Sequence, residues 1–82
     1  MTRPKTLYIK AKSSPNNFSF SELCKLAEKV GFVFRNQKGS HKIYKHTTLK
    51  KMMNFQPNDN KAAPYQIKQL LNFIDDNGLM EE

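Results

Sequence analysis

Cysteine, glycine, tryptophan and long apolar runs are scarce or absent in this chain of 82 residues. The single cysteine, Cys24, cannot form an internal disulfide, so the pattern of a small secreted scaffold is missing. Three glycines are too few to build a glycine-rich phosphate loop. No apolar run approaches the roughly 20 residues that a membrane helix needs, and the N-terminal residues lack the apolar stretch of a secretory signal. We therefore expect one small cytoplasmic domain without membrane contact.

Acidic residues are also few, and their distribution is uneven. Fourteen Lys and Arg against seven Asp and Glu give a formal net charge of +7. Residues 29–58 hold seven basic residues and no acidic one, and residues 1–18 likewise contain no acid. A concentrated field of one sign attracts polyanions, which makes nucleic acid the leading partner class. A lysine-rich surface that only keeps the protein soluble, or an acidic protein partner, would also fit.

The pattern divides the chain into an N-terminal extension, residues 1–17, and a main domain, residues 18–80. Residues 1–6 read as a loose tail. Leu7, Ile9 and Ala11 alternate with a tyrosine and two lysines, a pattern that predicts a possible short edge strand.

The main domain begins with a helix. Ser19 and Glu22 have the spacing of a capping box, and the apolar residues that follow recur at helical spacing up to Gly31. Strands are predicted from Phe32, from Ser40 to His46 and from about Lys51 to Gln56, with residues 36–39 as a turn. A second helix is expected from Pro64 to about Gly78. This order predicts an α+β fold, in which both helices pack on one face of a three-stranded antiparallel sheet and the other face stays open.

Side chains for catalysis or metal binding are few. His41 and His46 are the only histidines, and no acid lies within a dozen residues of either. Their spacing of five places them on opposite faces of a strand, so they cannot both bind one ion, and we expect no metal or other cofactor. Cys24 lies beside the apolar face of a helix and is interpreted as a packing residue.

His41 lies in the most basic part of the chain. An imidazole, with its ordinary pKa near 6.5, can take a proton from a ribose 2′-hydroxyl at about neutral pH. Basic neighbours could then hold the phosphate and offset its developing charge. The alternative is that His41 only makes a local hydrogen bond at the turn.

The sequence does not settle which face of its strand carries His41. If Ile43 is buried, His41 must reach the surface near the turn, and Tyr44 stands on the open face, where its ring could stack on a base. If Tyr44 belongs to the core, the arrangement is the reverse.

One segment resembles a known family. The residues Gly31-Phe32-x-Phe34-Arg35-x-x-x-Gly39-Ser40-His41-x-x-Tyr44 are similar to the signature of HicA-type toxins, the mRNA interferases of HicA–HicB toxin–antitoxin pairs. The helices on either side fall in matching places, so that the resemblance extends over about residues 19–79. It implies a double-stranded-RNA-binding-like α-β-β-β-α fold. It also implies metal-independent cleavage of mRNA, with His41 as the essential histidine, and a HicB-type antitoxin that covers the active site.

The prediction is therefore an endoribonuclease with His41 as acid or base. The predicted RNA contacts are Arg35, Lys38, Gly39, Ser40, Lys42, Tyr44 and Lys45. Two alternatives use the same fold: a non-catalytic RNA-binding module, and a basic interaction module for an acidic protein.

Overall fold

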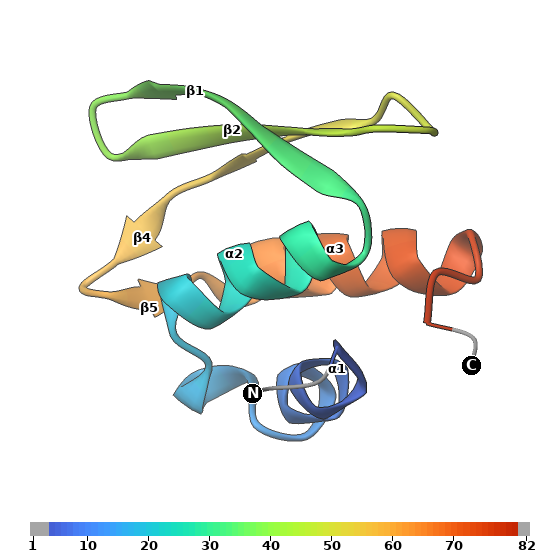
Figure 1. The fold of residues 1–82 in the computed structure, drawn as a ribbon. Coiled ribbons are helices and arrows are strands. Elements are labelled where there is room, and N and C mark those ends of the chain that lie inside the picture. Colours follow the sequence, from blue (N-terminus) through green and yellow to red (C-terminus); the bar gives the residue numbers. More distant parts are fainter. Residues whose placement is uncertain (1–3, 81–82) are drawn as a thin grey trace.

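The computed structural model describes residues 4–80 and confirms an α+β fold built on a three-stranded antiparallel sheet (Figure 1). In chain order the elements are α1 (Pro4–Ser13), a 3-10 turn (Pro15–Asn17), α2 (Phe20–Lys29), β1 (Phe32–Lys38), β2 (His41–His46), β3 (Met52–Phe55), β4 (Pro57–Asn58), β5 (Lys61–Ala62) and α3 (Pro64–Asp76). Within residues 4–80, no helix combines the length and the apolar character required to cross a membrane.

The sheet has the order β1-β2-β3, with β2 in the centre. The first hairpin is longer than predicted, because β1 continues to Lys38, which pairs with His41, and only Gly39 and Ser40 form the turn. Gly39 has φ +59°, which suits the first position of a type II′ turn. The register shifts between Phe34 and Asn36, so β1 carries a bulge at Arg35. Residues 36–38 do not read as a strand in the sequence because Asn36, Gln37 and Lys38 are polar and precede Gly39, which is the composition of a turn.

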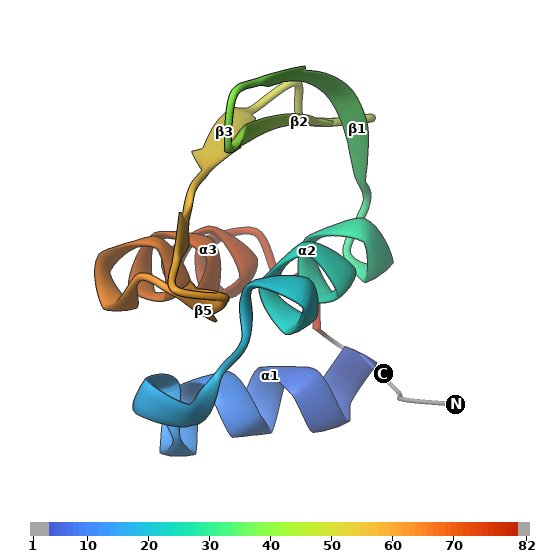
Figure 2. The same cartoon turned by 90° about the vertical axis from the view of Figure 1, so that its left-hand side faces the viewer.

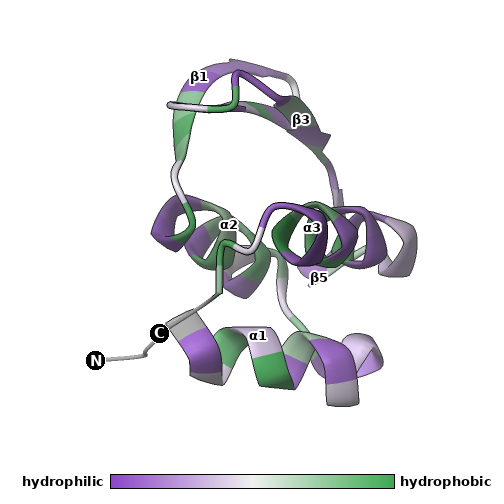
Figure 3. Ribbon diagram, turned by 90° about the vertical axis from the view of Figure 1, so that its right-hand side faces the viewer, coloured by the Kyte–Doolittle hydropathy of each residue, from purple (hydrophilic) through white to green (hydrophobic). Residues whose placement is uncertain are grey.

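Helices α2 and α3 cover one face of the sheet, as predicted, and the core lies between these two layers (Figures 1 and 2). The fully buried large side chains are Phe18, Leu23, Leu26, Phe32, Phe55, Ile67, Leu70 and Ile74. They come from both helices, from the sheet and from the segment before α2. The opposite face of the sheet is not covered by any element of residues 4–80. Much of β1 consists of hydrophilic residues (Figure 3).

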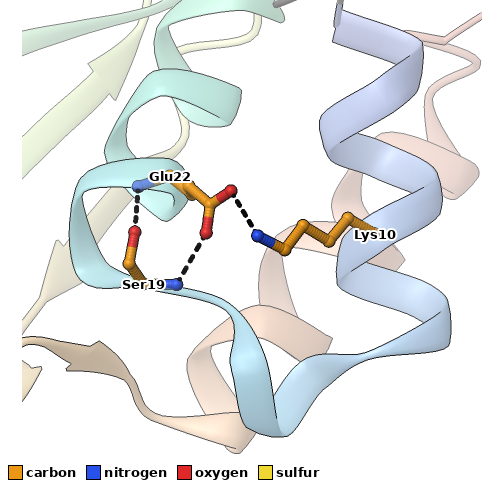
Figure 4. A network of polar contacts seen from close by, with 3 residues as sticks. All are labelled: Lys10, Ser19 and Glu22. Carbon is orange, nitrogen blue, oxygen red and sulfur yellow. Dashed lines mark hydrogen bonds and ion pairs between the residues drawn. The ribbon is translucent and has the colours of Figure 1, made fainter.

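The start of α2 carries the predicted capping box (Figure 4). The Glu22 backbone N–H donates to the Ser19 hydroxyl, and the Ser19 backbone N–H donates to the Glu22 carboxylate, both at 3.0 Å. Lys10 of α1 donates to the second carboxylate oxygen at 2.8 Å. Burial opposes ionisation of Glu22, but the hydrogen bonds from Lys10 and Ser19 prevail and hold its pKa below the ordinary value.

The predicted N-terminal edge strand is wrong, because residues 4–13 form helix α1. This helix lies on the far side of α2 and α3 from the sheet and adds a third layer (Figure 2). Leu7 and Ala11, one helical turn apart, are buried there, whereas Ile9 is 53% exposed. The tail prediction is also wrong for residues 4–6, which belong to α1, while residues 1–3 lie outside the described residues.

Two short strands that were not predicted, β4 and β5, form a hairpin below the main sheet. Asp59 and Asn60 make its turn with φ values of +51° and +67°. The hairpin is fixed to the start of α2, since the Phe20 N–H donates to the Asn60 carbonyl oxygen and the Ala62 N–H donates to that of Phe18, both at 3.0 Å. It therefore positions the first turn of α2 relative to the sheet.

Candidate nucleic-acid interface

His41 is the first residue of β2, directly after the Gly39-Ser40 turn, and its side chain is partly exposed. Its Nδ1 lies 3.2 Å from the side-chain oxygen of Asn54 on β3. Because an amide oxygen only accepts hydrogen bonds, this contact assigns the donor proton to Nδ1. In neutral His41 the unprotonated nitrogen is then Nε2, which has no partner among residues 4–80. The geometry therefore leaves a proton-accepting nitrogen available at the surface.

The alternation along β2 settles the face of each residue. Tyr44 and His46 are buried on the helix side, so His41, Ile43 and Lys45 belong to the open face. Of the two arrangements that the sequence left open, the one with Tyr44 in the core is therefore correct. His41 and His46 lie on opposite faces, as predicted. No three His, Cys, Asp or Glu side chains of the described residues are grouped so that they could hold a metal ion.

Tyr44 is not available to an RNA base on the open face, because its side chain is only 2% exposed. Its ring packs against Phe34 and Phe55, and its hydroxyl donates to the Glu28 carboxylate at 3.2 Å. Burial, followed by its contact with Cys24, raises the pKa of Tyr44. Of the two alternatives, the one in which Tyr44 stacks on a base at the open face is therefore wrong, because the strand alternation turns its ring into the core.

The second histidine, His46, is a structural residue. It is 4% exposed, its Nε2–H donates to the Val30 carbonyl oxygen at 2.8 Å, and its Nδ1 accepts the backbone N–H groups of Thr48 and Leu49. All of its hydrogen-bonding capacity is used inside the fold. His46 therefore has no free ring nitrogen with which to contact a substrate.

Cys24 is buried as well, as expected for a packing residue. Burial is the main cause that raises its pKa. A buried thiol with a raised pKa is a poor nucleophile.

The other predicted contacts lie around the hairpin. Lys38, Gly39 and Ser40 are exposed at its tip, beside His41. Lys42 points to the helix side, with its Nζ 5.8 Å from the centre of the Phe20 ring. The structure thus divides the predicted residues: His41 and Lys45 belong to the open face, the tip residues lie at its end, and Lys42 faces α2.

A second basic group lies at the other end of the hairpin. Arg35, Lys45 and Lys50 line a hollow of about 310 Å³, together with Val33, His46 and Thr47. No acidic residue lines it, and none of the three cations forms an ion pair with another residue of the described chain. The hollow and His41 lie at opposite ends of β2, so basic groups occur along the length of this strand.

Two residues of this surface, Asn54 and Lys50, were missed by the sequence analysis. Asn54 sits between the buried Met53 and Phe55, so its outward direction was readable from the strand alternation. Its contact with His41 could not be predicted from the sequence, because the contact depends on the register between β2 and β3. Lys50 was counted only as part of the total charge.

One of the comparisons with known proteins found a family match. A family model described as "HicA toxin of bacterial toxin-antitoxin" matches residues 20–75, which is more than half of the chain. The matched segment runs from the start of α2 almost to the end of α3 and leaves out α1. No curated protein and no solved structure matches the chain.

Proposed function

Because this chain belongs to the HicA family of toxins from bacterial toxin–antitoxin systems, we propose that it is a metal-independent endoribonuclease that cleaves mRNA. The observation that carries the proposal is the contact between His41 Nδ1 and the Asn54 side-chain oxygen. It orients the imidazole and leaves Nε2 as the proton acceptor at the surface.

The reaction needs no nucleophile from the protein, because RNA carries its own. Nε2 of His41 takes the proton from a ribose 2′-hydroxyl, and the 2′ oxygen attacks the adjacent phosphorus. The bond from phosphorus to the 5′ oxygen breaks, and that oxygen takes a proton from solvent water and leaves as a 5′-hydroxyl. The products end in a 2′,3′-cyclic phosphate and a 5′-hydroxyl group. Asn54 is a positioning residue in this scheme, since its side chain bonds to His41 and takes no part in the reaction.

The basic residues hold the substrate and stabilise the charge that develops on it. Lys38 and the backbone of Gly39 and Ser40 lie beside His41 at the exposed tip, where donors can reach the cleaved phosphate. Arg35, Lys45 and Lys50 would bind a second phosphate in the hollow at the other end of the strand. This distribution predicts that RNA lies along β2, and that its affinity falls steeply with salt.

The same uncovered surface is the proposed binding site for an antitoxin. Membership of the family implies an antitoxin partner, and we propose a HicB-type protein that covers His41 with an acidic surface. Charge complementarity supports this orientation, because the face offers several cations with no ion-pair partner among the described residues.

Cleavage of RNA in the presence of EDTA tests the proposal, with wild type compared with His41→Ala and Asn54→Ala. His41→Ala is expected to lose at least about 100-fold in rate, because a positioned acid or base contributes roughly 10²–10⁴-fold. Asn54→Ala should lose less, and its pH–rate profile should change, because the imidazole is still present but no longer held.

Circular dichroism must show that both variants are folded. Equal rates in wild type and His41→Ala would contradict the proposed role of His41. RNA binding without cleavage by any of the three proteins would instead identify a non-catalytic RNA-binding module.

A further inference from the structure

A cleft of about 580 Å³ lies on the helix side of the sheet, between β2 and the first turns of α2. The turn of the β4–β5 hairpin contributes Asn60 to its rim. Its lining includes Lys42 and Tyr44, so the cleft lies on the opposite side of the sheet from the open face that carries His41. Its volume is within the range of about 300–1,000 Å³ found for small-ligand sites. The proposed cleavage mechanism does not use it.

An aromatic ring and two lysines give this cleft the groups of a nucleotide site. Phe20 is only partly buried, so its ring contributes to the lining, and the Lys42 amine lies 5.8 Å from the ring centre. Lys25 also lines the cleft. Aromatic faces bind unstacked bases, and neighbouring cations bind the attached phosphates.

Glu28 adds a hydrogen-bond acceptor to the cleft. One of its carboxylate oxygens accepts the Tyr44 hydroxyl at 3.2 Å, and the other has no partner among residues 4–80. A carboxylate accepts hydrogen bonds and donates none. It can therefore bind the exocyclic amino group of adenine, cytosine or guanine, whereas uracil has no such group.

The cleft is close to the catalytic histidine along the chain. His41 and Lys42 are consecutive residues of β2, and their side chains lie on opposite faces of the strand. An RNA strand with its phosphate at His41 can turn an unpaired base around the exposed hairpin tip toward Lys42. The two faces of one strand would then bind two parts of the same substrate.

We propose that this cleft holds one unstacked, amino-bearing base from a nucleotide beside the cleaved bond, and thereby selects where the RNA is cut. Phe20 stacks on the base, Glu28 accepts from its amino group, and Lys25 and Lys42 bind its phosphates. This inference rests on the proposed function, because it adds substrate selection to that same site.

The test uses a short single-stranded RNA with a mapped cleavage position, in which each flanking nucleotide is made abasic in turn. At one position, loss of the base should lower kcat/KM of the wild type by about 5- to 150-fold, the range expected for base–aromatic stacking. Phe20→Leu keeps an apolar side chain without the ring, so it should cleave intact RNA more slowly and be nearly indifferent to the abasic site. Tyr65→Leu is the matched control, because Tyr65 is a 69% exposed ring at the start of α3 that does not line the cleft. In this control variant, the abasic nucleotide should lower kcat/KM as much as it does in the wild type.

Base identity at the same position tests Glu28. The wild type should prefer adenine, cytosine or guanine to uracil there, and Glu28→Gln should reduce this preference, because an amide can also donate to a uracil oxygen. Urea unfolding of each variant separates loss of selection from loss of folding.

The outcomes separate this inference from the proposed function. Cleavage that is insensitive to every abasic position overturns the inference and leaves the endoribonuclease intact. If the wild type does not cleave at all, binding is measured with 2-aminopurine in the RNA, whose fluorescence should be quenched in a Phe20-dependent way; no quenching overturns the inference. If Phe20→Leu weakens antitoxin binding but leaves the abasic penalty unchanged, the cleft is a protein interface and the inference fails.

Discussion

Replacement of Gly31 by alanine is expected to destabilise the protein severely, although Gly31 lies outside the proposed RNA-binding surface. Gly31 connects α2 to β1 with φ +112°, a conformation that side-chain-bearing residues rarely adopt. An alanine Cβ there would lie 2.6 Å from Nε2 of the buried His46. The imidazole would have to move, and its hydrogen bond to the Val30 carbonyl oxygen would be lost.

The size of the effect follows from these two causes. Backbone strain of this kind costs about 1–3 kcal/mol, and a buried group left without its hydrogen bond costs a further 1–3 kcal/mol or so. Together, these two causes predict a loss of about 2–6 kcal/mol in the free energy of unfolding. A domain of this size has roughly 4–12 kcal/mol in total, so Gly31→Ala should be largely unfolded under mild denaturing conditions.

Gly39→Ala is the matched control, because Gly39 also has a positive φ, +59°, but nothing lies within 4 Å of an added Cβ. Its cost should be only about 1–2 kcal/mol. Urea unfolding, followed by circular dichroism, compares the two variants. Equal losses in the free energy of unfolding for the two variants would refute the argument from the His46 contact. The argument would also fail if Gly31→Ala were as destabilising in a His46→Ala protein as in the wild type.

Three further predictions concern the packing of α1, the α2 cap and the basic surface. Leu7→Ala should reduce the free energy of unfolding by about 2–5 kcal/mol because Leu7 is 2% exposed; a loss below about 0.5 kcal/mol in urea would show that α1 does not dock. The pKa of Glu22 is lowered in the folded protein, so its ionised carboxylate stabilises the fold at pH values above its ordinary pKa of 4.5. This stabilisation is lost as the pH falls through the folded-state pKa. Glu22→Gln should therefore cost about 1 kcal/mol at neutral pH and much less in acid, and urea curves with the same difference at both pH values would contradict this. Lys45→Gln should lower RNA affinity and reduce the slope of log K against log salt by about 0.7, which fluorescence anisotropy measures; an unchanged slope would remove Lys45 from the interface.

The sequence predicted best where the determining contacts are local. The capping box of Ser19 and Glu22 and the turn at Gly31 each involve residues close together in the chain, so the extent of α2 was predicted correctly. The same holds for α3, whose apolar stripe and initial Pro64 were both recognised. The failure at residues 4–13 has a physical cause: Leu7 and Ala11 are four residues apart, and this spacing fits one face of a strand as well as one face of a helix.

The candidate site was predicted less completely, because it depends on register and on packing across layers. The position of His41 after the turn was predicted, but its contact with Asn54 requires the pairing of β2 with β3. Both faces of β2 carry apolar and basic residues, so the sequence could not decide that Tyr44 is buried. The tertiary structure decides it, because the Tyr44 ring packs between Phe34 and Phe55.

The most direct test of the central claim is cleavage of an RNA in which a single 2′-hydroxyl is replaced by hydrogen, at the nucleotide that supplies the attacking oxygen. The reaction is run in EDTA with wild type, and the products are mapped from both ends. The proposed mechanism predicts no cleavage at the substituted position and unchanged cleavage elsewhere, with cyclic phosphate and 5′-hydroxyl ends that disappear with His41→Ala. Continued cleavage at the 2′-deoxy position would show that the RNA does not supply the nucleophile and would contradict the proposed role of His41.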